Sequence, residues 1–157
     1  MKILYDHQAF TMQTHGGVTR CFAELISHLP DDISSVIAIK ESDNVYLKEK
    51  QLVEDLKPLS RSRRTFLGGV DNPLKEFLFN CLNYIPGVRT PKVINRDYSL
   101  ELIKRHDYDV FHPTFFDEYF LPYLGDKPFV LTVHDLISER MEINNGMIAR
   151  YLNARGW

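Results

Sequence analysis

Apolar residues along the chain alternate between short continuous runs and stripes with helical spacing. Four runs, rich in β-branched and aromatic residues, have the length typical of buried strands: 2–5, 35–40, 109–113 and 129–133. After the first run, apolar residues recur at helical spacing and predict a helix: Val18, Phe22, Leu25, Ile26 and Leu29. This alternation of strands and helices is typical of a parallel sheet built from β-α-β units.

Three further helices are predicted from the same pattern. A polar helix is expected over 45–56, a helix with an apolar stripe over 74–85, and another helix over 98–105. Together the elements predict an α/β fold, namely a Rossmann-like three-layer α/β/α sandwich with a mostly parallel sheet. The whole chain 1–157 is expected to form one domain.

Length and composition narrow the function classes. A chain of 157 residues with 44% hydrophobic side chains can bury the core of one domain. A net charge of -2 gives no general attraction for polyanions, so no nucleic-acid partner is expected. The sequence has no basic segment leading into an apolar run, which predicts a cytoplasmic protein. Cys21 and Cys81 lie far apart in the sequence and are interpreted as reduced core thiols.

A long connection and a glycine pair separate the first strand from the first helix. The connection 6–15 is longer than the roughly two to six residues usual at this position, and such length favours a binding role. Gly16 and Gly17 let backbone N–H groups approach an anion at the positive end of the helix. The pattern differs from G-x-G-x-x-G and from a P-loop, which disfavours nicotinamide and Walker-type binding. The alternative is an ordinary turn at the start of a helix.

His134 and Asp135 follow the strand 129–133 directly. Because the carboxyl ends of parallel strands meet at one edge of a sheet, these residues are expected to lie near the glycine pair. The alternative is structural: His134 binds nearby backbone, and Asp135 caps a helix. His112 also ends a strand, but Pro113 follows it, and a structural role is expected. Arg20 either reaches a phosphate at the helix start or lies on the solvated face.

Histidines and aromatic residues form two further candidate groups for binding. Four histidines could be imagined as a metal cluster, but none of their pairs has the spacing of metal ligands on one element, so neither a metal nor a cofactor is expected: His7, His15, His112 and His134. Five aromatic residues form either a platform for a sugar ring or packing at the edge of the sheet: Phe115, Phe116, Tyr119, Phe120 and Tyr123.

Two stretches carry a resemblance to a known family. "THGGVTRCFAEL" and "YDVFHPTFFDEYFLPYLGDKPFVLTVHDLISER", with the order of strands and helices between them, resemble the N-terminal domain of retaining GT-B glycosyltransferases. More narrowly, they are similar to family 4, the "glycosyl transferases group 1" enzymes. The likeness covers residues 1 to about 140, and 44–96 follow the family only in outline.

The resemblance implies roles for particular residues. Gly16 and Gly17 match the glycine-rich loop that lies against the donor phosphate or the acceptor. His134 matches the catalytic histidine that contacts the transferred sugar, and Asp135 holds that histidine or caps the next helix. In the family the sugar leaves its nucleoside diphosphate with retention of configuration, through an oxocarbenium-like transition state and without a divalent metal.

The family also implies partners for this domain. A second, C-terminal domain binds most of the nucleotide sugar, and that domain is absent from this chain, so the chain by itself is predicted to be inactive. The donor is expected to be a UDP- or GDP-sugar. The acceptor is expected to be a saccharide or a lipid-linked saccharide of surface polysaccharide synthesis.

Two alternatives remain open at the level of sequence. A basic cluster near the predicted helix 74–85 favours peripheral contact with the inner face of a membrane, and its alternative is a solvated loop beside a core-facing helix: Lys57, Arg61, Arg63 and Arg64. Exposure of Phe79 beside the arginines would favour membrane contact over the solvated loop. For the whole domain, the alternative is a non-catalytic Rossmann-like module that binds a phosphorylated ligand or a protein.

Overall fold

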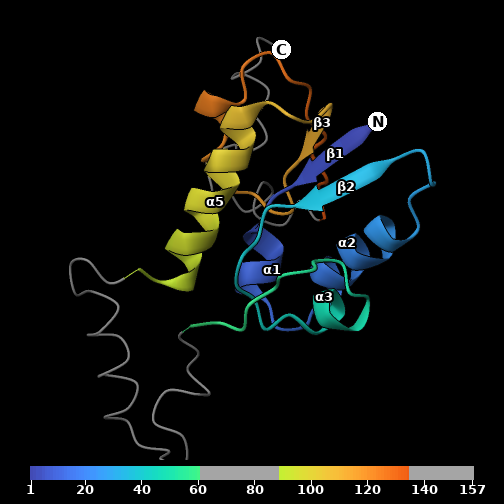
Figure 1. Cartoon of the computed structure of the whole chain (residues 1–157), viewed down its shortest axis with the longest axis vertical. Coiled ribbons are helices and arrows are strands. Elements are labelled where there is room, and N and C mark those ends of the chain that lie inside the picture. Colours follow the sequence, from blue (N-terminus) through green and yellow to red (C-terminus); the bar gives the residue numbers. More distant parts are fainter. Residues whose placement is uncertain (61–88, 135–157) are drawn as a thin grey trace, which may run out of the picture.

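The structure of the protein is a computed structural model that describes residues 1–60 and 89–134. Its elements follow in the order β1 (Lys2–Tyr5), α1 (Gln8–Met12), α2 (Gly17–Ser27), β2 (Ser34–Ile37), α3 (Val45–Glu49), α5 (Pro91–Arg105), β3 (Val110–His112) and the 3-10 helix η1 (Leu121–Tyr123). The strands form one sheet in the order β2-β1-β3, and both pairs are parallel (Figure 1). The predicted α/β class and the parallel pairing are therefore confirmed for the described residues.

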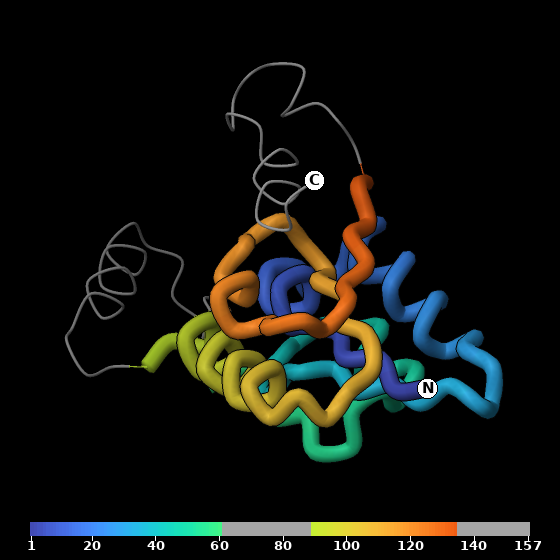
Figure 2. The backbone as a smooth tube through the Cα atoms, turned by 90° about the horizontal axis from the view of Figure 1, so that it is seen from above, coloured from blue at the N-terminus to red at the C-terminus, as the bar shows by residue number. Residues whose placement is uncertain are grey.

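The central strand β1 contributes to two separate cores. Leu4 belongs to a buried cluster with Ile103 of α5 and Phe111 of β3. Tyr5 belongs to the other cluster, and its ring meets that of Phe22 of α2 edge-on, with 6.2 Å between centroids. Because successive side chains of a strand point to opposite faces, α5 and α2 cover opposite faces of the sheet. Figures 1 and 2 show these two helices on its two sides.

Helix α5 is longer than the sequence pattern predicts. It begins at Pro91 rather than at Tyr98, because the Thr90 side chain accepts a hydrogen bond from the backbone N of Val93 and Pro91 suits the first turn. It ends where His106 takes the left-handed conformation, with φ 53°. The earlier start adds two more turns to the helix, and these turns carry cationic side chains.

Three other predictions of elements need correction. The connection 6–15 contains a short helix, α1, because its apolar Ala9 and Phe10 are buried. The helix expected over 45–56 ends at Glu49. The strand expected over 129–133 makes only an isolated parallel bridge, between Phe129 and Phe111. The helix predicted over 74–85 lies outside the described residues.

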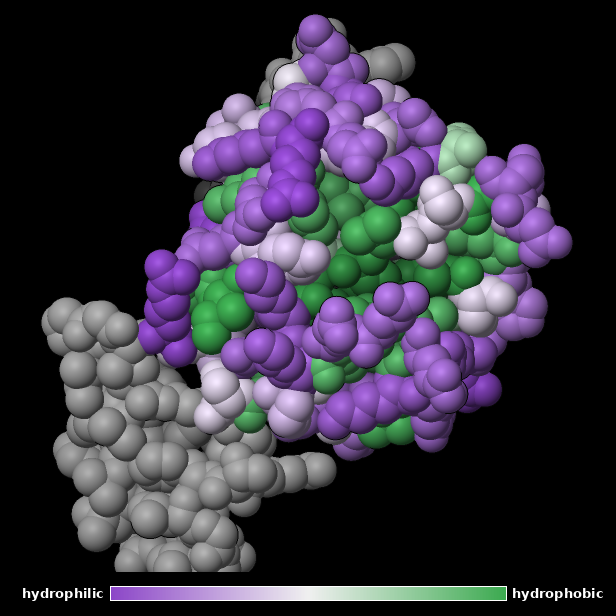
Figure 3. Space-filling model, in the orientation of Figure 1, coloured by the Kyte–Doolittle hydropathy of each residue, from purple (hydrophilic) through white to green (hydrophobic). Residues whose placement is uncertain are grey.

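Apolar surface lies beside the edge strand β2. Figure 3 shows apolar side chains in the middle of this face, surrounded by hydrophilic ones. A groove of about 1000 Å³ runs along β2, and its apolar lining includes Val36, Ile39 and Leu52. Within the described residues, β2 is therefore an edge of the sheet with apolar surface next to it.

The prediction that Cys21 is a core thiol is wrong. Cys21 is exposed and free, because its neighbour Phe22 takes the inward position on the helix. Cys81 lies outside the described residues. In the parts of the chain that the structure describes, no helix is both long enough and apolar enough to cross a membrane.

Candidate functional site

A buried carboxylate, Asp6, joins the carboxyl ends of β1 and β3. Asp6 follows β1 directly, and its Oδ1 accepts hydrogen bonds from the backbone N of Thr114 at 2.8 Å and from its Oγ1 at 2.6 Å. Gln8 donates from its Nε2 to Oδ2 at 2.6 Å and from its backbone N to Oδ1 at 3.2 Å. Burial raises the pKa of Asp6, and the hydrogen bonds from Thr114 and Gln8 act in the opposite direction. The network fixes α1 against the loop that follows β3.

The glycine pair lies where α2 begins. Gly16 is the N-cap residue, with an extended backbone, and Gly17 is the first helical residue; within the described chain no side chain caps this end through a hydrogen bond. Gly17 is exposed, and a Cβ added there would meet no atom of the described residues within 4 Å. The first N–H groups of a helix have no acceptor within it, so those of α2 need an acceptor from outside the helix.

Replacing Gly17 by alanine is expected to raise the free energy of unfolding by about 0.4–1 kcal/mol, because alanine reduces the entropy of the unfolded chain and its Cβ fits. Gly125→Ala is the matched control. Gly125 has φ +58°, and its Cβ would lie 3.1 Å from Cε1 of His106, so a loss of about 1–2 kcal/mol is expected. Urea unfolding of both variants measures the difference. A destabilised Gly17→Ala would show that the fold itself needs this glycine.

The structure places His134 beside α2. Its ring meets that of Phe22 edge-on, with 5.6 Å between centroids, and its Nε2 is buried without a hydrogen-bond partner among the described residues. His112 meets the same Phe22 ring at 5.2 Å, and its Nε2 lies 2.8 Å from Oγ1 of Thr132. Burial, and to a smaller extent His134, lowers the pKa of His112 to about 4, so this ring is neutral at pH 7. Both histidines therefore lie on the α2 side of the sheet.

The remaining predicted site residues lie apart from these contacts or outside the described chain. Arg20 is exposed on α2, and its charge is one of the smaller causes, after Lys50, that lower the pKa of Glu24. Asp135 lies outside the described residues. Lys57 is exposed. The other members of the basic cluster, Arg61, Arg63 and Arg64, lie outside the described residues, and so does Phe79. Within the described parts, no group of three His, Cys, Asp or Glu side chains is placed to hold a metal ion.

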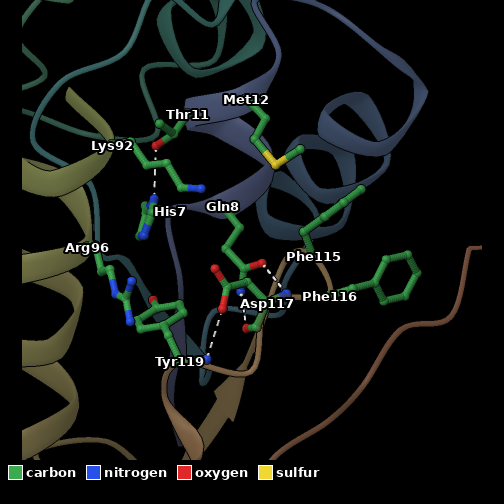
Figure 4. A pocket seen from close by; sticks show the side chains of 10 residues that line it. All are labelled: His7, Gln8, Thr11, Met12, Lys92, Arg96, Phe115, Phe116, Asp117 and Tyr119. Atoms are coloured by element: carbon green, nitrogen blue, oxygen red, sulfur yellow. Dashed lines mark hydrogen bonds between the residues drawn. The ribbon is translucent and has the colours of Figure 1, made fainter. Parts of the chain in front are cut away.

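A second group of side chains lines a pocket of about 440 Å³ between α1, α5 and the loop after β3; we call it the α1–α5 pocket. Figure 4 shows Lys92 and Arg96 of α5 with His7 on one side. Three apolar side chains lie on the other side: Met12, Phe115 and Phe116. Of the five aromatic residues considered from sequence, Phe115, Phe116 and Tyr119 line this pocket, whereas Phe120 is buried in the core and Tyr123 is exposed.

His7 is a buried histidine at this pocket. Its Nδ1 lies 3.0 Å from Oγ1 of Thr11, and its Nε2 is buried with no hydrogen-bond partner among the described residues. Burial is the largest cause that lowers the pKa of His7 to about 4, and the charges of Lys92 and Arg96 add to it. The ring is therefore neutral at pH 7.

The sequence contains two signals for this pocket, one at the end of β1 and one at the start of α5. Asp6 and His7 follow β1 directly, as His134 and Asp135 follow the run 129–133, so the same argument from strand ends applied to them. Lys92 and Arg96 lie one turn apart and share a helix face only because α5 begins at Pro91. The Thr-Pro pair before them was the available signal.

The chain was compared with known proteins in three ways. No family model matches it, no curated protein matches it, and no solved structure matches it.

Proposed function

We propose that this chain is the acceptor-side domain of a retaining GT-B glycosyltransferase of the family 4 type. The enzyme transfers a sugar from a UDP- or GDP-linked donor to a saccharide or lipid-linked saccharide, in surface polysaccharide synthesis at the cytoplasmic face of a membrane. In this proposal the described elements belong to a three-layer α/β/α sandwich, and a second domain supplies most of the donor site.

The packing of His134 against Phe22 is the observation that carries the proposal. Phe22 belongs to α2, the helix that begins at Gly17, and His134 lies within the other stretch on which the resemblance rests. The contact therefore joins two motifs that are far apart in the sequence. The parallel sheet supports the same assignment, because ligands of such folds bind beyond the carboxyl ends of the strands.

The N-terminal end of α2 suits the charge that develops during sugar transfer. When the bond between the anomeric carbon and the diphosphate breaks, its electron pair leaves with the diphosphate and positive charge develops on the sugar ring. Backbone N–H groups after Gly16 and the positive end of the helix would stabilise the leaving diphosphate. Because these groups are held in place before the reaction, they lower the barrier more than mobile solvent does.

In this proposal His134 positions the sugar through its Nε2. Its Nε2 is buried next to Phe22 and is not used by any hydrogen bond within the described residues. A hydrogen bond from this nitrogen to the sugar forms in apolar surroundings, where it is stronger than in water. His112 packs against the same Phe22 ring and helps to hold that ring in position.

Sugar transfer by the complete product of the reading frame that encodes this chain tests the proposal. With a panel of UDP- and GDP-sugars, His134→Ala is expected to lower kcat/KM about a hundredfold, because a positioned group in the transition state is lost. His28→Ala is the control, since His28 is exposed at the end of α2.

Two results would contradict the proposal. The first is transfer that His134→Ala leaves unchanged. The second is no transfer from any donor by the complete product, which would favour a non-catalytic module that binds a phosphorylated ligand or a protein.

A further inference from the structure

We propose that the α1–α5 pocket binds an amphipathic phosphate, that is, a phosphate monoester of an apolar alcohol. Its phosphate would lie between Lys92 and Arg96, and its apolar part would lie against Met12, Phe115 and Phe116 (Figure 4). This inference goes beyond the proposed function and does not rest on it, because the pocket requires neither the glycine pair nor His134.

Two cations on one face of α5 are the reason for proposing a phosphate group in the ligand. Lys92 and Arg96 lie one turn apart on α5, and neither makes an ion pair with a carboxylate of the described residues. Arg96 lies over the ring of Tyr119, with 5.3 Å to its centroid, which holds the guanidinium at the pocket. Two adjacent positive charges match a phosphate monoester, which carries about -1.5 to -2 charges at pH 7.

Apolar side chains on the opposite side of the pocket are the reason for proposing an apolar part of the ligand. Met12 is 60% exposed although it is apolar, and Phe115 and Phe116 lie beside it as a pair of rings with 4.9 Å between centroids. Burial of this surface by an apolar chain removes it from water and therefore strengthens binding. A free inorganic anion would leave the surface exposed, so the two sides together select an amphipathic ligand.

The pocket is held in place before any ligand binds. Oε1 of Gln8 accepts a hydrogen bond from the backbone N of Asp117 at 2.8 Å, and its Nε2 donates to the carbonyl O of Asp117 at 2.9 Å. Asp117 is an acidic residue of the lining, and its Oδ1 accepts a hydrogen bond from the backbone N of Tyr119 at 3.1 Å. His7 lines the pocket and is only 3% exposed. Its Nε2 has no hydrogen-bond partner within the described chain.

Binding of hexyl phosphate to the full chain, measured by calorimetry, tests this inference. We expect hexyl phosphate to bind at least about tenfold more tightly than either inorganic phosphate or hexanol, because each of these lacks one half of the ligand. Lys92→Ala and Arg96→Ala are each expected to weaken binding about tenfold. Met12→Ala is expected to weaken the binding of hexyl phosphate and to leave that of inorganic phosphate unchanged.

Lys104→Ala is the matched control for the two cations. Lys104 lies on the same helix and over a tyrosine ring, that of Tyr123 at 4.4 Å, but does not line the pocket. All four substituted side chains are exposed, so the fold is expected to persist, and unchanged thermal unfolding checks this. Equal losses in Lys104→Ala and Lys92→Ala would overturn the headgroup site.

Two competing ligands give the other outcomes that would overturn the inference. Hexanol that binds as tightly as hexyl phosphate would show that the cations play no part. Glucose 1-phosphate that binds as tightly as hexyl phosphate, with no effect of Met12→Ala, would show that the pocket binds a phosphorylated sugar rather than an apolar phosphate. The sugar-transfer assay is independent of both results.

Discussion

Replacing Asp6 by alanine is expected to lower the free energy of unfolding by about 3–5 kcal/mol. The side chain is fully buried, and Thr114, Gln8 and Tyr119 all donate to its oxygens. Alanine would leave these buried donors without an acceptor. Because a domain of this size has only about 5–15 kcal/mol of stability, the loss would be a large part of it.

Equilibrium unfolding in urea, followed by circular dichroism, measures this effect. Asp107→Ala is the control, because the Asp107 carboxylate is 81% exposed and its ion pair with Lys2 lies in solvent, where little change is expected. A second variant, Asp6→Asn, keeps the size of the side chain but turns one acceptor into a donor, and an intermediate loss is expected. Equal stability of Asp6→Ala and Asp107→Ala would show that the buried network does not hold β1 and β3 together.

Acidification is expected to destabilise the fold between about pH 6.5 and pH 4 through His7. Its pKa is about 4 in the folded chain, against 6.5 for the unperturbed group, so the unfolded chain binds more protons in this window. Stability is therefore complete above pH 6.5 and is lost as the pH falls. The difference of about 2.5 in pKa corresponds to about 3 kcal/mol. His112, with a pKa lowered to about 4, acts in the same direction.

The slope of the unfolding free energy against pH isolates the contribution of His7. Asp6 acts in the opposite sense, because its raised pKa lets the folded chain take up a proton first as the pH falls. His7→Gln is therefore compared with the unsubstituted chain, and we expect a shallower slope between pH 4 and 6.5. His28→Gln, at an exposed position, is the control. An unchanged slope in His7→Gln would contradict a neutral, buried His7.

The elements with a strong hydrophobic period were predicted well. The stripe from Val18 to Leu29 predicted α2, which spans Gly17–Ser27, and the runs 2–5 and 109–113 predicted β1 and β3. Helix ends were predicted less well, because a cap such as Thr90 stabilises a first turn that has no apolar stripe. The run 129–133 is apolar enough for a strand, but the parallel ladder reaches it only at Phe129.

The α/β class and the parallel pairing could be predicted from the sequence, because they depend on local periodicity and on the direction of the strands. Which side chains share a site depends on the packed fold. Asp6 meets Thr114, and His7 meets Lys92 and Arg96, across segments far apart in the chain. Such contacts depend on how helices pack against the two faces of the sheet, and no local pattern encodes that packing.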